Sequence, residues 1–78
     1  MILTSKLIKS SAYPYFVELT DCTDDECSKV YEWCKETFGI GARPGRNVID
    51  ARWLKPLIYD GVRFKHEADR IWFVMRWS

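Results

Sequence analysis

The last fifteen residues, from Phe64 to Ser78, constrain the fold of this chain most strongly. A charged turn, Lys65 to Arg70, leads into the apolar run Ile71 to Met75, and Arg76-Trp77-Ser78 ends the chain. A chain end with this much apolar surface gains nothing from fraying and is expected to pack against other parts of the protein. We therefore predict that the C-terminal segment is a structural part of a folded domain.

The size and the aromatic content of the chain predict one small globular domain, residues 1–78. Of its 78 residues, 47% are hydrophobic, and they include four Trp, four Tyr and four Phe. A domain of this size buries only about 60% of the surface that its unfolded chain exposes. Some aromatic surface is therefore expected to remain exposed, and that surface is the first candidate for contact with a partner.

The charge is distributed unevenly along the chain. Residues 1–39 contain four Lys and seven acidic residues, whereas residues 40–78 contain eight Lys and Arg and four acidic residues, and the net charge is +1. Such asymmetry can indicate an anionic partner for the basic half. It also arises when an acidic helix packs beside basic strands.

The cellular location is predicted from what the sequence lacks. No apolar run reaches the length of a secretory signal or a membrane span, so we expect no membrane partner and a cytoplasmic location. The three cysteines, Cys22, Cys27 and Cys34, are odd in number and lie in or beside one predicted helix. This arrangement suits reduced thiols in a cytosol better than a disulfide framework.

Two segments near the N-terminus have strand character. In Tyr13 to Thr20, alternate residues are apolar and many are β-branched or aromatic, which predicts a strand with Pro14 at its start or on an edge. The pattern of Ile2 to Lys9 is weaker. Residues 1–10 therefore form either an additional strand or a loosely attached arm.

A helix is predicted between Thr23 and Gly39. Thr23 followed by Asp24-Asp25-Glu26 forms a capping box, and the acidic residues lie where the helix dipole favours negative charge. Gly39 is typical of a helix end. The apolar residues follow the i, i+3, i+4, i+7 spacing of a single buried stripe, and they are Cys27, Val30, Tyr31, Cys34 and Phe38.

The middle of the chain predicts a loop followed by a hairpin. Residues Gly39 to Asn47 contain three Gly, one Pro and two Arg, the composition of a connector with unusual backbone angles. A strand from Val48 to Tyr59, broken at Pro56, is then expected to pair with Val62 to Phe64. Asp60-Gly61 favours a two-residue turn between them.

The end of the chain fits two structures. Ala68, Ile71, Trp72 and Met75 have helical spacing, whereas Ile71, Phe73, Met75 and Trp77 would line one face of a strand. Glu67 and Asp69 favour a helix start. We therefore expect an α+β fold, with an antiparallel sheet of about three strands and one long helix and a C-terminal helix, or strand, packed on one face.

The C-terminal residues also carry a resemblance. Glu67-Ala68-Asp69-Arg70 followed by Phe73 and Met75-Arg76-Trp77 resembles the ending of many short uncharacterised proteins of tailed bacteriophages, although Arg70 replaces a small residue. The resemblance covers about fifteen residues. It implies a viral accessory protein of unknown role, and it identifies no catalytic residue.

No pattern in the sequence predicts a reaction centre. Cys27 and Cys34 lie about 10.5 Å apart along an intact helix, too far to bind one zinc ion, and no Cys-x2-Cys pair is present. His66 is expected in a solvent-exposed turn. Cys22, next to the positive end of the helix, is the only thiol placed to have a lowered pKa. We therefore predict no catalytic residue, no metal and no cofactor.

Basic residues alternate with aromatic residues in the second half of the chain. This pattern favours a non-enzymatic protein-binding domain, because Trp, Tyr and Arg dominate interface hot spots. The resemblance to phage proteins implies that the partner is a host protein, and self-association with a second copy is the variant. The same pattern is typical of proteins that bind single-stranded nucleic acid, which is the alternative. The candidate partner-binding residues are Arg43, Arg46, Arg52, Trp53, Arg76 and Trp77.

Overall fold

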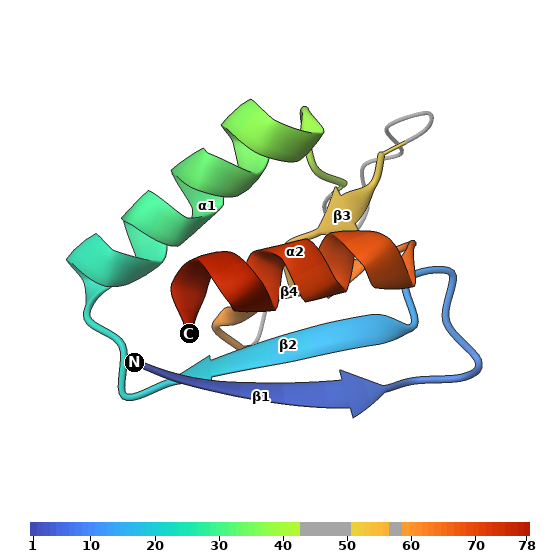
Figure 1. Cartoon of the computed structure of the whole chain (residues 1–78), viewed down its shortest axis with the longest axis horizontal. Coiled ribbons are helices and arrows are strands. Elements are labelled where there is room, and N and C mark those ends of the chain that lie inside the picture. Colours follow the sequence, from blue (N-terminus) through green and yellow to red (C-terminus); the bar gives the residue numbers. More distant parts are fainter. Residues whose placement is uncertain (43–50, 57–58) are drawn as a thin grey trace.

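In the part of the chain that the structure describes, the fold is an antiparallel sheet with two helices. A computed structural model describes residues 1–42, 51–56 and 59–78. The four strands lie in the order β1-β2-β4-β3, and neighbouring strands are antiparallel. In chain order the elements are β1 (Ile2–Leu7), β2 (Tyr15–Thr20), α1 (Asp24–Phe38), β3 (Trp53–Leu54), β4 (Gly61–Phe64) and α2 (Glu67–Trp77) (Figure 1).

The predicted α+β class is confirmed, and the sheet has one strand more than the three expected. The additional strand is β1, which pairs with β2 along its whole length, from Ile2 opposite Thr20 to Leu7 opposite Tyr15. The N-terminal segment is therefore a strand and not a loosely attached arm. The predicted strand Tyr13 to Thr20 is confirmed from Tyr15 onward.

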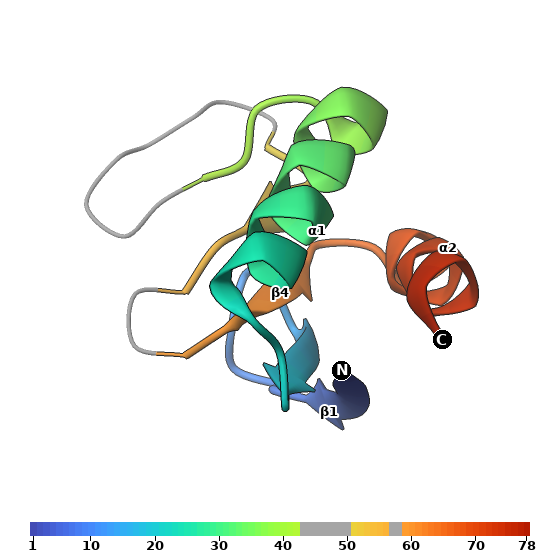
Figure 2. The ribbon, with the colours of Figure 1, turned by 90° about the vertical axis from the view of Figure 1, so that its left-hand side faces the viewer.

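The core lies between one face of the sheet and the two helices. The register places Val17 opposite Val62 and Tyr15 opposite Phe64, so their side chains share a face. Figure 2 shows α2 nearly end-on and α1 obliquely, both beside the strands. The buried core residues of the sheet and of both helices are Val17, Leu19, Val30, Cys34, Phe38, Trp53, Val62, Phe64 and Phe73.

Helix α1 follows its sequence prediction closely. The amide of Glu26 donates to the Thr23 hydroxyl at 3.2 Å, and the Thr23 amide donates back to the Glu26 carboxylate at 3.1 Å. This capping box satisfies two backbone donors at the helix start. Of the predicted stripe, Tyr31 is half-buried and the other residues are buried. Gly39 ends the helix with a φ of 87°, in the left-handed region that favours glycine.

Trp53 holds the segment that follows α1. Its indole nitrogen donates to the carbonyl of Gly39 at 2.8 Å, and its ring lies against Gly41. A Cβ atom at Gly41 would come within 2.6 Å of the indole, so only glycine fits this contact. Residues 43–47 of the predicted loop lie outside the described residues.

The β3–β4 hairpin is confirmed, but its predicted turn is wrong. Trp53 pairs with Phe64 and Leu54 pairs with Arg63, so residues 55–60 connect the strands and Asp60-Gly61 is not a two-residue turn. Gly61 is instead the first residue of β4. A Cβ atom at this position would lie 2.6 Å from the Val17 carbonyl oxygen of β2. Glycine therefore allows the two strands to lie this close together.

The long strand predicted from Val48 to Tyr59 is also corrected. Within its described residues, only Trp53 and Leu54 form a strand, while Tyr59 lies in a bend. Residues 48–50 and 57–58 lie outside the described residues. Lys55 and Pro56, which follow Leu54 directly, are not part of the strand, in agreement with the break expected at Pro56.

Candidate functional site

Helix α2 has a buried side that attaches it to the sheet. Phe73 is completely buried, and its ring centroid lies 5.3 Å from that of Phe64 in β4. Asp69 is also buried, one turn earlier. Trp77, one turn later, is partly buried against the same core. The C-terminal segment is therefore a helix, as its charged start favoured, and it is a structural part of the domain.

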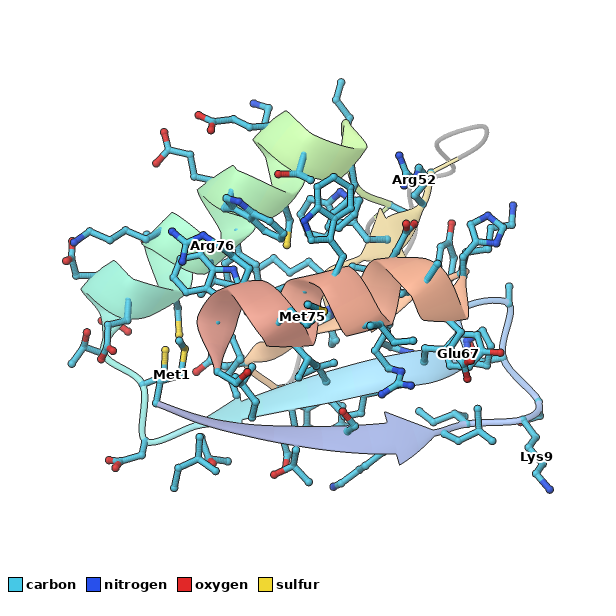
Figure 3. All side chains as sticks on the ribbon, in the orientation of Figure 1. Met1, Lys9, Arg52, Glu67, Met75 and Arg76 are labelled. Atoms are coloured by element: carbon cyan, nitrogen blue, oxygen red, sulfur yellow. The ribbon has the colours of Figure 1, made fainter. Side chains whose placement is uncertain are left out.

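The opposite side of α2 is apolar and exposed. Ile71, Trp72 and Met75 keep 45%, 52% and 75% of their surface accessible, and Ala68 is exposed as well. These four residues are the stripe with helical spacing that predicted the helix, yet they point away from the sheet. Figure 3 shows Met75 on the side of α2 that faces the reader. We call Ala68, Ile71, Trp72 and Met75 the outer face of α2.

A cluster of aromatic rings fixes one edge of the outer face. Trp33 of α1 lies edge-on to Trp72, with ring centroids 6.2 Å apart, and Phe38 lies edge-on to Trp72 at 5.5 Å. Trp33 also lies edge-on to Trp77 at 6.1 Å. Edge-to-face contacts of this kind are favourable beyond the area that they bury. The half-exposed ring of Trp72 is therefore held in place by α1 before any partner arrives.

Arg52 and Asp69 connect the first turn of α2 to the residue before β3. The Arg52 side chain donates two hydrogen bonds to the Asp69 carboxylate, at 3.0 Å and 2.6 Å. The hydrogen bond to Asp69 raises the pKa of Arg52. The guanidinium also lies 5.1 Å from the centre of the Phe38 ring. Arg52 therefore serves the fold and is not a free cation for a partner.

The structure brings few of the predicted partner-binding residues together. Trp53 is only 5% exposed and belongs to the core, so it is not an exposed anchor. Arg76 stacks on Trp77, with 4.4 Å between its guanidinium carbon and the ring centre. Figure 3 shows Arg52 and Arg76 at opposite ends of α2. Arg43 and Arg46 lie outside the described residues.

Sequence reasoning missed three exposed side chains as binding candidates, Ile71, Trp72 and Met75. The signal was present, because the chain end carries more apolar residues than one helix side can bury against a sheet. The helical spacing of these residues predicts the helix but does not indicate which of its sides meets the sheet. A second apolar stripe on a short helix is a pattern that could have revealed the outer face.

Other basic side chains of the described residues are engaged on different parts of the surface. Arg63 donates to the Tyr13 carbonyl at 3.2 Å, on the sheet face opposite to the helices. The ammonium of Lys55 lies 4.4 Å from the centre of the Tyr31 ring. These contacts are separate from the Arg76–Trp77 stack. Arg63, Lys55 and Arg76 therefore do not share one continuous surface.

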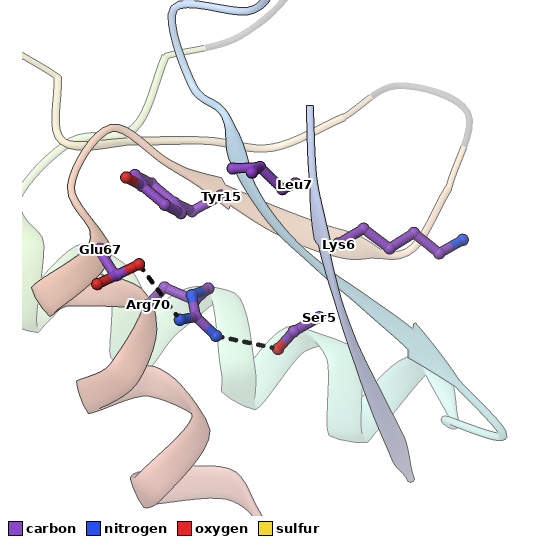
Figure 4. A pocket seen from close by; sticks show the side chains of 6 residues that line it. All are labelled: Ser5, Lys6, Leu7, Tyr15, Glu67 and Arg70. Carbon is purple, nitrogen blue, oxygen red and sulfur yellow. Dashed lines mark hydrogen bonds and ion pairs between the residues drawn. The ribbon is translucent and has the colours of Figure 1, made fainter. Parts of the chain in front are cut away.

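A shallow depression of about 320 Å³ lies between β1 and the start of α2. Arg70 reaches across it from α2 and donates to the Ser5 hydroxyl at 3.4 Å, with the Glu67 carboxylate 3.9 Å away (Figure 4). The depression contains no thiol or imidazole that could act as a nucleophile or base. Its lining residues are Ser5, Lys6, Leu7, Tyr15, Glu67 and Arg70.

The His66 imidazole forms no hydrogen bond with the thiols of Cys22, Cys27 or Cys34. Burial raises the pKa of Cys34 to about 12, so this thiol is protonated at neutral pH. His66 is exposed and precedes α2, and its side chain accepts no capping hydrogen bond from the start of the helix. Across residues 1–42, 51–56 and 59–78, no three His, Cys, Asp or Glu side chains gather in a way that could hold a metal ion.

Neither α1 nor α2, the helices of the described part of the chain, has the length and apolar character needed to cross a membrane. No family model, curated protein or solved structure matches this chain. Its function must therefore be inferred from the residues on its own surface.

Proposed function

We propose that this chain is a non-enzymatic protein-binding domain and that the outer face of α2 is its contact surface. The exposure of Ile71, Trp72 and Met75 on one side of one helix carries this proposal. Aromatic residues and Met are enriched in protein interfaces, and an apolar stripe rimmed by polar residues is typical of a binding site. The outer face is therefore the part of the described surface best suited to a partner.

The spacing of the outer face suggests how the partner binds. Ala68, Ile71, Trp72 and Met75 follow the i, i+3, i+4, i+7 pattern of a helix that lays its apolar side into a groove. The ring of Trp72 is already fixed by α1, so little side-chain entropy is lost on binding. We therefore propose a partner with an apolar groove that receives α2, with Trp72 as the central anchor.

The partner is proposed to be another protein. The resemblance of the C-terminal residues to phage accessory proteins would make it a host protein, met in the host cytoplasm. Self-association is the variant of this proposal, in which the outer faces of two copies pack together. Arg76, exposed near the end of the stripe, offers a positive charge to an acidic rim of either partner.

Nucleic-acid binding has less support as an alternative. A single-strand binder needs a cationic groove lined with rings on which bases can stack. Here Arg52 is paired with Asp69, Arg63 is bonded to the Tyr13 carbonyl, and Arg76 alone accompanies the exposed aromatic surface of α2. The described basic residues thus lie on several surfaces instead of along one path.

The test compares a double charge substitution on the outer face with a single charge substitution elsewhere on the surface. The variant Ile71→Glu/Met75→Glu places two carboxylates on the outer face, and Ile40→Glu changes an aliphatic residue that is 67% exposed beyond the end of α1. Each immobilised protein is incubated with lysate of the cells in which the chain is naturally expressed. We expect one protein to bind saturably to wild type and to Ile40→Glu, with at least about a tenfold loss for Ile71→Glu/Met75→Glu.

Three measurements complete this test. Circular dichroism and urea unfolding establish that each variant folds. Sedimentation of the purified chain detects self-association, which the outer-face variant should abolish. Equal capture by all three proteins, or a monomer that captures nothing, would contradict the proposal. Binding of wild type to a single-stranded oligonucleotide that weakens steeply with salt would support the nucleic-acid alternative instead.

A further inference from the structure

Two thiols are in contact at the junction between β2 and α1. The sulfur atoms of Cys22 and Cys27 lie 2.7 Å apart. Non-bonded carbon atoms prefer about 3.5–4.0 Å, and a disulfide bond measures about 2.03–2.05 Å. The pair is therefore closer than ordinary packing, and only a small approach of the two sulfur atoms separates it from a covalent bond.

The fold itself creates this contact. Thr23 is the N-cap of α1, so Cys22 precedes the cap and Cys27 is the fourth helical residue. Residues at these two positions pack against each other in the hydrophobic staple, which fixes the angle at which the chain enters a helix. The capping box between Thr23 and Glu26 holds the same turn. The approach of the sulfur atoms thus follows from how α1 begins.

We propose that Cys22 and Cys27 form a reversible dithiol–disulfide pair, oxidised by a small-molecule disulfide of the glutathione type. Cys22 is partly exposed and Cys27 is buried, so an oxidant reaches Cys22 first. Cys34 takes no part, because it is fully buried and lies seven residues further along α1, about 10.5 Å away. The proposal goes beyond protein binding, since neither thiol belongs to the outer face of α2.

The reaction has two exchange steps. The Cys22 thiolate attacks one sulfur of oxidised glutathione, and the mixed disulfide forms while one glutathione thiolate leaves. Cys27 then loses its proton to solvent and attacks the Cys22 sulfur, which releases the second glutathione. Two protein thiols are oxidised to one disulfide, and one oxidised glutathione is reduced to two glutathione molecules.

The environment of Cys27 slows the second step. Burial, followed by the hydrogen bond to Cys22, raises the pKa of Cys27 to about 12. In the mixed disulfide the Cys22 thiol is gone, but the burial of Cys27 remains and still disfavours its thiolate at neutral pH, which slows the second step. Its rate should rise about tenfold for each pH unit below the pKa of Cys27. Thiol–disulfide exchange therefore begins at Cys22 and ends at Cys27.

The experiment measures the equilibrium between the folded chain and a glutathione buffer. Samples are quenched with acid, unfolded, alkylated and analysed by intact mass. We expect wild type to lose two hydrogen atoms and to keep one alkylatable thiol, assigned to Cys34 by peptide mapping. Cys34→Ala should keep none, whereas Cys27→Ser should stop as a glutathione adduct at Cys22.

The same equilibrium in urea shows whether the fold favours the bond. We expect the constant for closure to be at least about tenfold higher in the folded chain than in the unfolded chain, because the fold holds the sulfur atoms together. By linkage, oxidation then lowers the unfolding equilibrium constant by the same factor. A wild-type chain that keeps three thiols, that stops as a mixed disulfide, or that closes equally well in urea would overturn the proposal.

Discussion

The two helices carry the same apolar spacing and use it in opposite ways. In α1 the stripe that includes Val30, Cys34 and Phe38 is buried in the core, whereas in α2 the stripe that includes Ile71 and Met75 faces away from the sheet. Hydrophobic periodicity therefore predicts that a segment is a helix. It does not determine which side of the helix meets the core when two sides are apolar.

The helices also differ in how their first turns are held. Helix α1 begins with a complete capping box, formed by residues three positions apart. Helix α2 begins after His66, which forms no side-chain cap, and Asp69 of its first turn is held by Arg52, seventeen residues earlier in the chain. The start of α1 is thus stabilised by local contacts, and the start of α2 depends on the assembled sheet.

The largest expected effect tests the orientation of α2. Phe73→Ala removes a completely buried ring beside Phe64 and should lower the free energy of unfolding by about 3–5 kcal/mol. Met75→Ala removes a side chain that is 75% exposed and should change it by no more than about 0.5 kcal/mol. Urea unfolding followed by Trp fluorescence measures both. Equal losses would mean that α2 does not present these two sides as described.

An intermediate effect is expected at the first turn of α2. Asp69→Ala should cost about 1–3 kcal/mol, because it removes two charge-assisted hydrogen bonds. The cost stays below that of a fully buried pair, since the Arg52 side chain is 43% exposed and remains hydrated. The matched control is Glu67→Ala, which breaks an exposed pair with Arg70 and should cost about 0–1 kcal/mol.

A double-mutant cycle isolates the Asp69 contact. If Arg52 and Asp69 hold α2 together as a pair, the cost of Arg52→Ala/Asp69→Ala in urea unfolding will be smaller than the sum of the two single costs. Strict additivity would show that the carboxylate and the guanidinium act independently. The local contacts of α1 would then no longer contrast with a long-range attachment of α2.

The smallest expected effect concerns the capping box of α1. Hydrogen bonds from the backbone and the side chain of Thr23 lower the pKa of Glu26. A carboxyl group with a lowered pKa in the folded state stabilises the fold above its unfolded pKa of about 4.3, and this stability is lost as the pH falls through the folded value. Glu26→Gln should therefore weaken the decrease of stability in acid, measured by urea unfolding below about pH 5.

A second variant should show an intermediate dependence of stability on acid pH. Thr23→Ala removes the side-chain donor and leaves the backbone donor to Glu26, so its acid dependence should lie between those of wild type and Glu26→Gln. An acid dependence that is identical in all three proteins would contradict the role of the capping box. The start of α1 would then depend on tertiary contacts in the same way as α2.

Much of the fold could be predicted from local residue patterns. The cap at Thr23, the buried stripe of α1, the alternation in β2 and the α+β class all follow from contacts between residues close in the chain. The role of Gly61 could not be predicted in this way. Glycine is needed at this position because the Val17 carbonyl oxygen of β2 lies 2.6 Å from the place of a Cβ atom, and β2 is distant from Gly61 in the sequence.

The candidate site was less predictable than the fold. Arg52 and Trp53 look like interface residues in the sequence, yet one pairs with Asp69 and the other is buried in the core. Conversely, Trp72 and Met75 look like core residues and are exposed. Residue type alone indicates that a side chain is suited to burial, and it does not indicate whether the chain or a partner supplies the covering surface.

By itself, the sequence determined helix α1 and strand β2, because capping, glycine termination and apolar alternation act over a few neighbouring residues. Only the tertiary structure decided the sheet order β1-β2-β4-β3 and the side of α2 that meets the core. Both depend on long-range contacts, such as Phe64 with Phe73 and Arg52 with Asp69, that exist only once the sheet has formed. The outer face of α2 is exposed because one helix cannot bury two opposite apolar sides against a single sheet.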